Sequence, residues 1–321
     1  MILLIDQPKC GIDWLSQELT PLNQGLVFIN QHFDNSKIVA IYSELSTKLD
    51  RAYLEQFPNL EVIATPTTSL TQLDLDFCMN ESIKVISLKD FQKEISDFSA
   101  TIEIAVWHLL ELFRRVSSSV SSVRFGNWDR NEFVGVTLAH KSIGILGFGR
   151  LGRKMAKVCE AMGMRVFIYD IKQISKGILS DSYTLVDSIA ELFSLCDAVS
   201  IHVDDRSTNR RLIDANVLAS ISSKGLMLIN TSRGFVVDEE AVLFYLKEGR
   251  LKGYGTDVLT GEEILNKELD WLSASNMFKA LLNEGLNISL TPHIGGATIE
   301  TMTTSSRLVL ESLISKIKSI S

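Results

Sequence analysis

The fold of this chain is decided by the stretch Ile143-Gly-Ile-Leu-Gly147-Phe-Gly149-Arg-Leu-Gly152, in which an apolar strand runs into the spacing G-x-G-x-x-G and the opening of a helix. Gly147 permits a tight turn, Gly149 lets the backbone approach a pyrophosphate, and Gly152 allows close packing of helix on strand. The free N–H groups of the helix N-terminus suit an anion. The stretch predicts a dinucleotide site that includes Arg150 and Leu151, the alternative being a glycine-rich turn without a nucleotide.

An acidic residue follows at the spacing that such a site requires. The strand predicted over 165–169 ends at Asp170, which lies 18 residues after Gly152. A carboxylate at this position accepts hydrogen bonds from the adenosine ribose hydroxyls. It would repel a 2′-phosphate, so Asp170 predicts NAD rather than NADP as the cofactor.

Short apolar runs alternate with helical segments along the whole chain, which is typical of parallel sheets covered by helices on both faces. The fold class is therefore α/β, with a doubly wound unit from residue 143 onward. A mostly apolar helix is predicted over 102–116, a serine-rich surface loop over 117–122 and a last helix over 298–318. Strands are predicted over 2–5, 26–30, 38–42, 61–65, 83–86, 143–147, 165–169, 198–202, 226–230 and 253–257, and further helices over 48–56, 150–162, 187–195, 214–221 and 238–248.

Length and composition limit the function further. A chain of 321 residues is long enough for two domains. Its net charge of −7 argues against nucleic acid as a partner, and no apolar run is long enough to span a membrane. The start Met1–Asp6 reads as a strand, and Cys10, Cys78, Cys159 and Cys196 form no C-x-x-C pair. We therefore expect reduced thiols, no metal site and a cytoplasmic location.

Three more segments follow predicted strands, at the sheet edge where open α/β proteins bind ligands. They are Ile229-Asn-Thr-Ser-Arg233-Gly234, Gly255-Thr-Asp257-Val-Leu-Thr-Gly-Glu262 and Leu290-Thr-Pro-His293-Ile-Gly-Gly296. Together with the glycine fingerprint, this ordered set resembles the D-isomer-specific 2-hydroxyacid dehydrogenases. The likeness extends from about residue 60 to the end of the chain.

The resemblance implies a catalytic triad. Arg233 would bind the carboxylate and carbonyl oxygen of the substrate, a task that suits a rigid and permanently charged guanidinium. His293 would be the general acid and base. Glu262 would be the partner of His293 and raise its pKa, with Glu263 as the neighbouring alternative. The other interpretations are a surface ion pair for Arg233 and a packed, non-catalytic histidine at 293.

The resemblance also implies a set of residues that line the cofactor site. His202-Val203-Asp204-Asp205 stands where the family usually has His-x-Pro-Leu, so Asp204 is expected to weaken cofactor binding. His202 either lines the cofactor site or is a packed histidine at a strand end. Asp257 would hold the nicotinamide carboxamide or else cap a turn, and Thr101 would lie near the cofactor or simply start a helix. The remaining residues expected to contact the cofactor are Val203, Thr231, Gly295 and Gly296.

In the first part of the chain, Thr65-Pro-Thr-Thr68-Ser69-Leu70 resembles the family's substrate loop. Thr68, Ser69 and Leu70 would offer backbone N–H groups to the substrate carboxylate, although Ser69 stands where glycine is common. The segment 59–79 contains no Lys or Arg. A phosphate dianion would need such donors, so we expect an unphosphorylated substrate.

The architecture implied by the resemblance is an NAD domain over 99–296, inserted in a smaller flavodoxin-like substrate domain over 1–98 and 297–321. Such proteins dimerise near the helix at 102–116, so a homodimer is expected. The implied function is NAD-dependent interconversion of a D-2-hydroxy acid and its 2-oxo acid. The alternatives are an NAD(H)-sensing interaction protein of corepressor type and oxidation of phosphite on the same scaffold.

Overall fold

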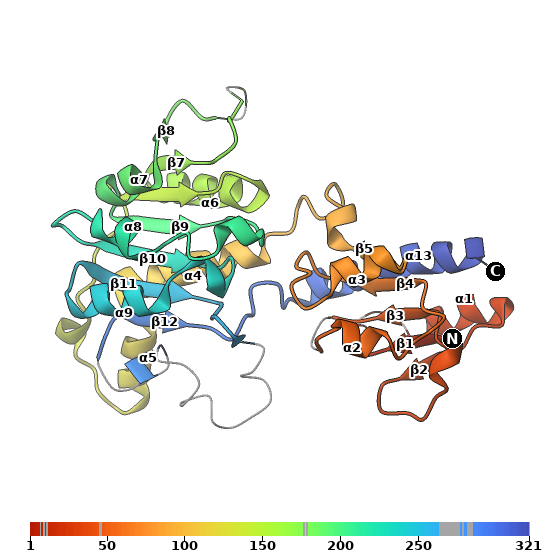
Figure 1. The fold of residues 1–321 in the computed structure, drawn as a ribbon. Coiled ribbons are helices and arrows are strands. Elements are labelled where there is room, and N and C mark those ends of the chain that lie inside the picture. Colours follow the sequence, from red (N-terminus) through yellow and green to blue (C-terminus); the bar gives the residue numbers. More distant parts are fainter. Residues whose placement is uncertain are drawn as a thin grey trace. The chain divides into compact units, whose positions relative to one another are not determined.

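The computed structural model describes residues 1–320 apart from 7, 9, 11, 45–46, 176, 178, 263–276, 278 and 281–284. The chain divides into two compact units. Unit 1 combines Met1–Phe98 with Gly296–Ser321, so that both ends of the chain belong to it (Figure 1). Unit 2 is the continuous segment Ser99–Gly295.

Unit 1 is built on a parallel sheet of five strands in the order β2-β1-β3-β4-β5. This is the flavodoxin-like order, which confirms the fold class predicted for this part of the chain. The strands are β1 (Ile2–Leu4), β2 (Leu26–Phe28), β3 (Ala40–Tyr42), β4 (Val62–Thr65) and β5 (Lys84–Ser87), and the helices are α1 (Ile12–Leu19), α2 (Arg51–Leu54), α3 (Leu75–Asn80) and α13 (Ile299–Ile320).

The last helix closes one face of this sheet. The apolar side of α13 packs against β4, β5 and α1, and Val309, Leu310 and Leu313 are fully buried there. The hydroxyl of Tyr42 lies 3.0 Å from that of Ser306. Burial of this apolar stripe explains why a segment some 200 residues beyond β5 belongs to unit 1.

Unit 2 is built on a parallel sheet of seven strands in the order β12-β11-β10-β9-β6-β7-β8 (Figure 1). The chain starts in the middle at β6, winds outward through β7 to β8, and then returns to β9 and winds the other way. This is the doubly wound fold predicted from the sequence. The strands are β6 (Ser142–Leu146), β7 (Arg165–Tyr169), β8 (Thr184–Leu185), β9 (Ala198–Ile201), β10 (Leu226–Asn230), β11 (Leu251–Thr256) and β12 (Ile288–Leu290).

Most short helices begin at a side-chain cap, whereas the helix after the glycine fingerprint does not. Asp50, Asp74, Ser188, Asp214 and Asp238 each accept a hydrogen bond from a backbone N–H of the first turn. Helix α6 instead starts after a glycine without a side-chain cap. The helices of unit 2 are α4 (Ala100–Arg114), α5 (Val116–Arg124), α6 (Arg150–Ala161), α7 (Ile189–Leu195), α8 (Ala215–Ala219) and α9 (Glu239–Lys247).

The serine-rich stretch is helical, so the prediction of a surface loop over 117–122 is wrong. Arg115 takes a left-handed conformation that ends α4, and α5 begins at Val116. The carboxylate of Glu111 accepts hydrogen bonds from the backbone N–H and the hydroxyl of Ser117. A carboxylate at a helix N-terminus is stabilising, and this cap comes from the preceding helix rather than from the serines themselves.

Within the described part of the chain, no helix is both long and apolar enough to cross a membrane.

Candidate active site

The glycine fingerprint lies at the point where the sheet of unit 2 reverses its winding, between β6 and β9. Gly147 follows β6 with a φ of +92°, in the left-handed region that favours glycine. A Cβ at this residue would come within 2.7 Å of the carbonyl oxygen of His202, which follows β9. Gly147 therefore lets the two strand ends converge at the position where open α/β sheets bind ligands.

The start of α6 is shaped to receive an anion. A Cβ added at Gly149 would meet nothing within 4 Å, so there is open space above the first turn. A Cβ at Gly152, in contrast, would lie 1.9 Å from the carbonyl oxygen of Gly147, so this glycine keeps the helix against the turn. Uncapped N–H groups beside an open space fit a pyrophosphate. Arg150 and Leu151 belong to this first turn, Arg150 with a pKa lowered by burial.

Asp170 is fixed at the end of β7 by two backbone groups. The N–H of Phe148 donates to one carboxylate oxygen at 2.6 Å, and the N–H of Lys172 donates to the other at 2.8 Å. A carboxylate has about four lone pairs, so each oxygen keeps capacity for a ribose hydroxyl.

Asp204, which stands where the family usually has a proline, is paired with a positively charged side chain. Its carboxylate forms an ion pair with Arg206, two residues further on, and accepts a hydrogen bond from the Asn209 amide at 3.0 Å. The guanidinium of Arg206 is the main reason that the pKa of Asp204 is lowered. Sequence reasoning named the acid and missed this partner, although an arginine two residues away is a readable signal.

Three more predicted cofactor residues lie at the ends of β9 and β10. The Nε2 of His202 lies 2.9 Å from the hydroxyl of Ser200, and burial lowers the pKa of His202 to about 4, so its ring is neutral at pH 7. The carbonyl of Val203 accepts a hydrogen bond from Ser232 at 2.6 Å. The hydroxyl of Thr231 is buried and has no hydrogen-bond partner among the described residues.

Arg233 follows the same strand and is half-buried. One Nη donates to the carbonyl of Ser232 at 2.6 Å, whereas Nε has no hydrogen-bond partner within the described ranges. Burial lowers the pKa of Arg233, yet a guanidinium keeps its charge at any physiological pH. A buried N–H without a partner is costly, so the Nε of this half-buried side chain fits an anionic ligand that offers a carboxylate.

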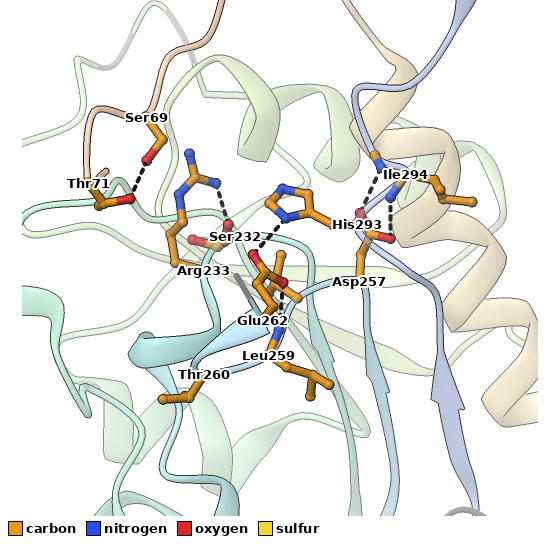
Figure 2. A network of polar contacts seen from close by, with 12 residues as sticks. Ser69, Thr71, Ser232, Arg233, Asp257, Leu259, Thr260, Glu262, His293 and Ile294 are labelled. Carbon is orange, nitrogen blue, oxygen red and sulfur yellow. Dashed lines mark hydrogen bonds and ion pairs between the residues drawn. The ribbon is translucent and has the colours of Figure 1, made fainter. Parts of the chain in front are cut away.

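His293 and Glu262 form a pair, with the imidazole Nδ1 2.7 Å from the Glu262 carboxylate (Figure 2). The second oxygen of Glu262 accepts a hydrogen bond from the N–H of Leu259 at 3.0 Å, which orients the carboxylate. The hydrogen bond with Glu262 is the largest cause of the raised pKa of His293. Nε2 is thereby left as the atom that can give and take a proton.

The turn that carries His293 is held by Asp257. The carboxylate accepts a hydrogen bond from the N–H of Ile294 at 2.9 Å (Figure 2). It also accepts from the hydroxyl of Thr291 at 2.5 Å and from the N–H of Gly295 at 2.7 Å. Burial nevertheless raises the pKa of Asp257. The structure thus shows Asp257 capping a turn, and one lone pair stays available for a carboxamide.

Thr101 and the two glycines lie at the far end of this turn. The hydroxyl of Thr101, in the first turn of α4, donates to the carbonyl of Gly295 at 3.2 Å. A Cβ at Gly295 would lie 2.9 Å from the Asp257 carboxylate, so the glycine is needed for the close approach. At Gly296, where unit 1 resumes, a Cβ would meet nothing within 4 Å.

Glu239 supports the Glu262 side of the His293–Glu262 pair. This residue was not predicted from the sequence. Its carboxylate, at the start of α9, accepts a hydrogen bond from the N–H of Thr260 at 2.7 Å and so fixes the turn before Glu262. Burial raises the pKa of Glu239. No sequence signal marks it, because acids are common in the first turn of any helix. Glu263, the alternative partner of His293, lies outside the described residues.

The predicted substrate loop belongs to unit 1 and follows β4. The hydroxyl of Thr67 donates to the carbonyl of Ser69 at 2.7 Å, and the hydroxyl of Ser69 lies 3.3 Å from that of Thr71 (Figure 2). Ser69 is not among the residues with positive φ, so its backbone does not require glycine. Thr68 and Leu70 are half-buried on either side of it.

Comparison with known proteins identifies the family. The family model described as "D-isomer specific 2-hydroxyacid dehydrogenase, NAD binding domain" matches residues 106–295. The chain belongs to the D-isomer-specific 2-hydroxyacid dehydrogenase family. The match lies within unit 2, and it confirms the family resemblance and the prediction of NAD.

Relatives within the D-isomer-specific 2-hydroxyacid dehydrogenases differ in length and name. The D-3-phosphoglycerate dehydrogenase of Haemophilus influenzae is 32% identical over 79% of this chain, which spans only 58% of that relative. The glyoxylate reductase of Thermococcus litoralis is 30% identical over 87% of this chain and 80% of its own length. A D-lactate dehydrogenase from Aquifex aeolicus, solved with NAD and lactic acid, has the same fold, with a TM-score of 0.84 and 24% identity over 99% of this chain and 96% of that one.

The open space above α6 of this family member gives a first prediction. Replacing Gly149 with Ala should leave the thermal stability nearly unchanged, because the added methyl meets no protein atom within 4 Å. The methyl would occupy the space proposed for the pyrophosphate and should raise the Kd for NAD. Calorimetric titration with NAD and a melting curve measure the two effects; unchanged affinity would place the pyrophosphate elsewhere.

The His293–Glu262 pair gives a second prediction. Glu262→Gln should lower the pKa of His293, because the largest cause of its rise is lost. In the acid–base role that the family resemblance implies for His293, reduction of an oxo acid needs the imidazolium, so its rate would fall as pH rises through the pKa of His293. That fall should begin at lower pH in the variant. A rate profile against pH with NADH measures it, and coincident profiles would remove Glu262 as the partner.

Proposed function

We propose that the protein is an NAD-dependent dehydrogenase that interconverts a D-2-hydroxy acid and its 2-oxo acid. The observation that carries the proposal is a half-buried arginine whose Nε is buried and unpaired among the described residues, in the same unit as a histidine held by a carboxylate. Bound NAD supplies the hydride acceptor or donor at its nicotinamide. Everything else in the reaction, namely substrate binding and proton transfer, falls to residues of this chain.

Arg233 binds the substrate in this proposal. Its planar guanidinium offers two parallel N–H donors to a carboxylate and fixes both position and orientation. The same positive charge stabilises the negative charge that develops on the carbonyl oxygen during reduction. Because the side chain is half-buried, this attraction is screened less than it would be in water.

His293 transfers the proton. As an imidazolium it donates from Nε2 to the carbonyl oxygen when the 2-oxo acid is reduced, and as a neutral ring it takes the proton back when the hydroxy acid is oxidised. Glu262 keeps the tautomer with Nδ1 protonated and favours the imidazolium. The assignment of unit 1 as the substrate domain is part of the proposal and rests on the likeness of Thr68, Ser69 and Leu70 to the family's substrate loop.

A protein that only senses NAD(H) is the second candidate, and oxidation of phosphite is a third. The hydrogen-bonded pair of His293 with Glu262 favours catalysis over sensing, because cofactor binding alone needs no proton donor. A binding protein would respond to NAD without turnover, and a phosphite oxidase would reduce NAD with phosphite.

The test is a panel of 2-oxo acids with NADH, together with phosphite and NAD. We expect turnover with at least one 2-oxo acid and a loss of about 10²–10⁴-fold in His293→Asn, the usual contribution of general acid–base catalysis. His140→Asn is the matched control, because both histidines have left-handed φ, which asparagine tolerates. NAD binding without turnover of any acid would support the sensor instead.

Within this panel, unphosphorylated acids should be the better substrates. The segment 59–79 has no Lys or Arg, and the hydroxyls of Thr67 and Ser69 already have neighbours within hydrogen-bond distance. A tenfold higher kcat/KM for 3-phosphohydroxypyruvate than for hydroxypyruvate, about 1.4 kcal/mol in transition-state binding, would contradict this inference.

NADH should be preferred over NADPH. At an effective dielectric near 20, a phosphate about 4 Å from the Asp170 carboxylate meets a repulsion of about 4 kcal/mol per pair of charges. Asp170→Asn should therefore reduce the ratio of kcat/KM values for NADH and NADPH, whereas Asp181→Asn, an exposed acid, should not. Equal kcat/KM values for the two cofactors in the parent enzyme would refute the preference.

We also propose a homodimer next to the predicted helix. Helix α4 is mostly buried within unit 2, whereas large apolar side chains beyond it face solvent. Phe125, Trp128 and Val134 are 89%, 88% and 77% exposed. Large exposed apolar side chains this close in the sequence fit an interface, and a second copy of this chain would cover them by twofold symmetry.

The mass in solution tests the dimer. Light scattering after gel filtration should give twice the chain mass, and the double variant Phe125→Asp with Trp128→Asp should give the monomer mass. Ile171→Asp, at an apolar residue that is 79% exposed elsewhere in unit 2, should stay dimeric. A monomeric parent protein would refute the proposal.

A cytoplasmic location remains part of the proposal. It is supported by the free thiols of Cys78, Cys159 and Cys196, which are all buried. Burial raises the pKa of Cys159 and of Cys196 to about 12, so both are unreactive thiols.

A further inference from the structure

Helix α4 carries a buried imidazole that neither the fold nor the proposed reaction explains. His108 is fully buried where α4 packs on β11 and β12. Its Nδ1 lies 2.8 Å from the hydroxyl of Ser289, and its Nε2 lies 3.1 Å from the hydroxyl of Thr291. Gly255 makes room for it, since a Cβ there would approach the Cβ of His108 to 2.8 Å. Burial lowers the pKa of His108 to about 4, so the ring is neutral at pH 7.

The hydrogen bonds of this imidazole can run in only one direction. The hydroxyl of Thr291 lies 2.5 Å from a carboxylate oxygen of Asp257, and an ionised carboxylate only accepts. The hydroxyl of Thr291 therefore donates its one hydrogen to Asp257, and its oxygen accepts a hydrogen bond from the Nε2–H of His108. The neutral ring then accepts at Nδ1 from Ser289. The network assigns a chain of donors from Ser289 through His108 and Thr291 to Asp257.

The chain ends on the turn that carries the candidate acid and base. Asp257 accepts the N–H groups of Ile294 and Gly295, the two residues that follow His293. His293 itself has a φ of +53°, in the left-handed region that is uncommon for any residue other than glycine, although Asn, Asp and His adopt it more often than the rest. Such a backbone persists only where its surroundings hold it, and these hydrogen bonds hold it here.

We propose that His108 is a positioning residue, which acts through Thr291 and Asp257 to hold the His293 turn so that its imidazole meets Glu262. This inference rests on the proposed function for its importance to catalysis, but the geometry that it explains is present without substrate. His108 bonds to Ser289 and Thr291 and acts on His293 through them, so it is not itself a catalytic residue.

The charges that face His293 make the effect measurable. Glu262 and Asp257 raise the pKa of His293, and Arg233 lowers it. The hydrogen bond with Glu262 is the largest of these contributions and depends on close contact. A turn that loses its support weakens this hydrogen bond, so the pKa of His293 should fall even though no charged group has been removed.

Two amide substitutions at position 108 test the hydrogen bond at Nε2 separately from the one at Nδ1. In His108→Gln the amide nitrogen reaches the position of Nε2 and can still donate to Thr291. In His108→Asn the shorter amide reaches only the position of Nδ1, so the donor to Thr291 is lost. Thr291→Val removes the next link without changing the shape of the side chain.

Ser142→Ala is the matched control. Ser142 is fully buried at the start of β6, at the opposite end of the strands, and its hydroxyl donates to the Asp197 carboxylate at 2.7 Å. The substitution therefore removes the same kind of bond, from a hydroxyl to a carboxylate, in the same unit. It should lower the melting temperature without affecting His293.

The experiment is an NMR titration of the full chain labelled with ¹³C-histidine, without substrate or cofactor, in which only five histidines need to be assigned. His108→Asn and Thr291→Val should lower the pKa of His293, His108→Gln should restore it toward the parent value, and Ser142→Ala should leave it unchanged. In parallel, kcat for 2-oxo acid reduction should fall about 10- to 100-fold in the first two variants, as for other groups that orient a reactive side chain without touching the substrate.

The two readouts separate this inference from the proposed function. A His293 pKa that is the same in Thr291→Val, His108→Asn and the parent protein overturns the positioning role, whatever the activity. A shifted pKa in a protein that reduces no 2-oxo acid upholds the positioning role and refutes the dehydrogenase.

Discussion

The site depends on one buried carboxylate, that of Asp257 at the end of β11. A buried charge is costly unless it is hydrogen-bonded or paired, and Asp257 meets this requirement with three donors from the single turn 291–295. The carboxylate, for its part, gives hydrogen-bond partners to backbone N–H groups of the turn that a short loop would otherwise leave unpaired. Because acid and turn satisfy each other, the position of His293 is fixed by the end of strand β11 rather than by a loose loop.

Close backbone contacts then bring the other groups to the same edge of the sheet. A Cβ at Gly234 would lie 2.1 Å from the carbonyl carbon of Leu259, so the turn after Arg233 touches the turn that leads to Glu262. The side chain of Asn230 ties the first of these turns together, since its amide donates to the carbonyl of Arg233 and its oxygen accepts from Ser232. Gly234 thus permits the close approach of the two turns, and Asn230 fixes the shape of the first one. Together they determine which charged groups become neighbours.

The resulting charge arrangement suits proton transfer beside an anion. Arg233 is a permanent cation, Glu262 and Asp257 are acids, and His293 is the one group with an ordinary pKa near neutrality. The two acids favour the charged imidazole and the arginine opposes it. A substrate carboxylate on Arg233 would offset that opposition, so binding of an oxo acid and protonation of His293 would support each other.

The sequence by itself determined the α/β class, the glycine fingerprint and the identity of the candidate triad, because these depend on local periodicity and on motifs whose residues lie within a few positions. It failed for the serine-rich stretch, where the cap of α5 comes from Glu111 on another helix. The Asp204–Arg206 pair is local and could have been read from the sequence, but only the tertiary structure revealed the support from Glu239 and the chain from His108 to Asp257. His108 and Thr291 are 183 positions apart, and only the packing of α4 on the sheet makes them neighbours, so no local pattern could connect them.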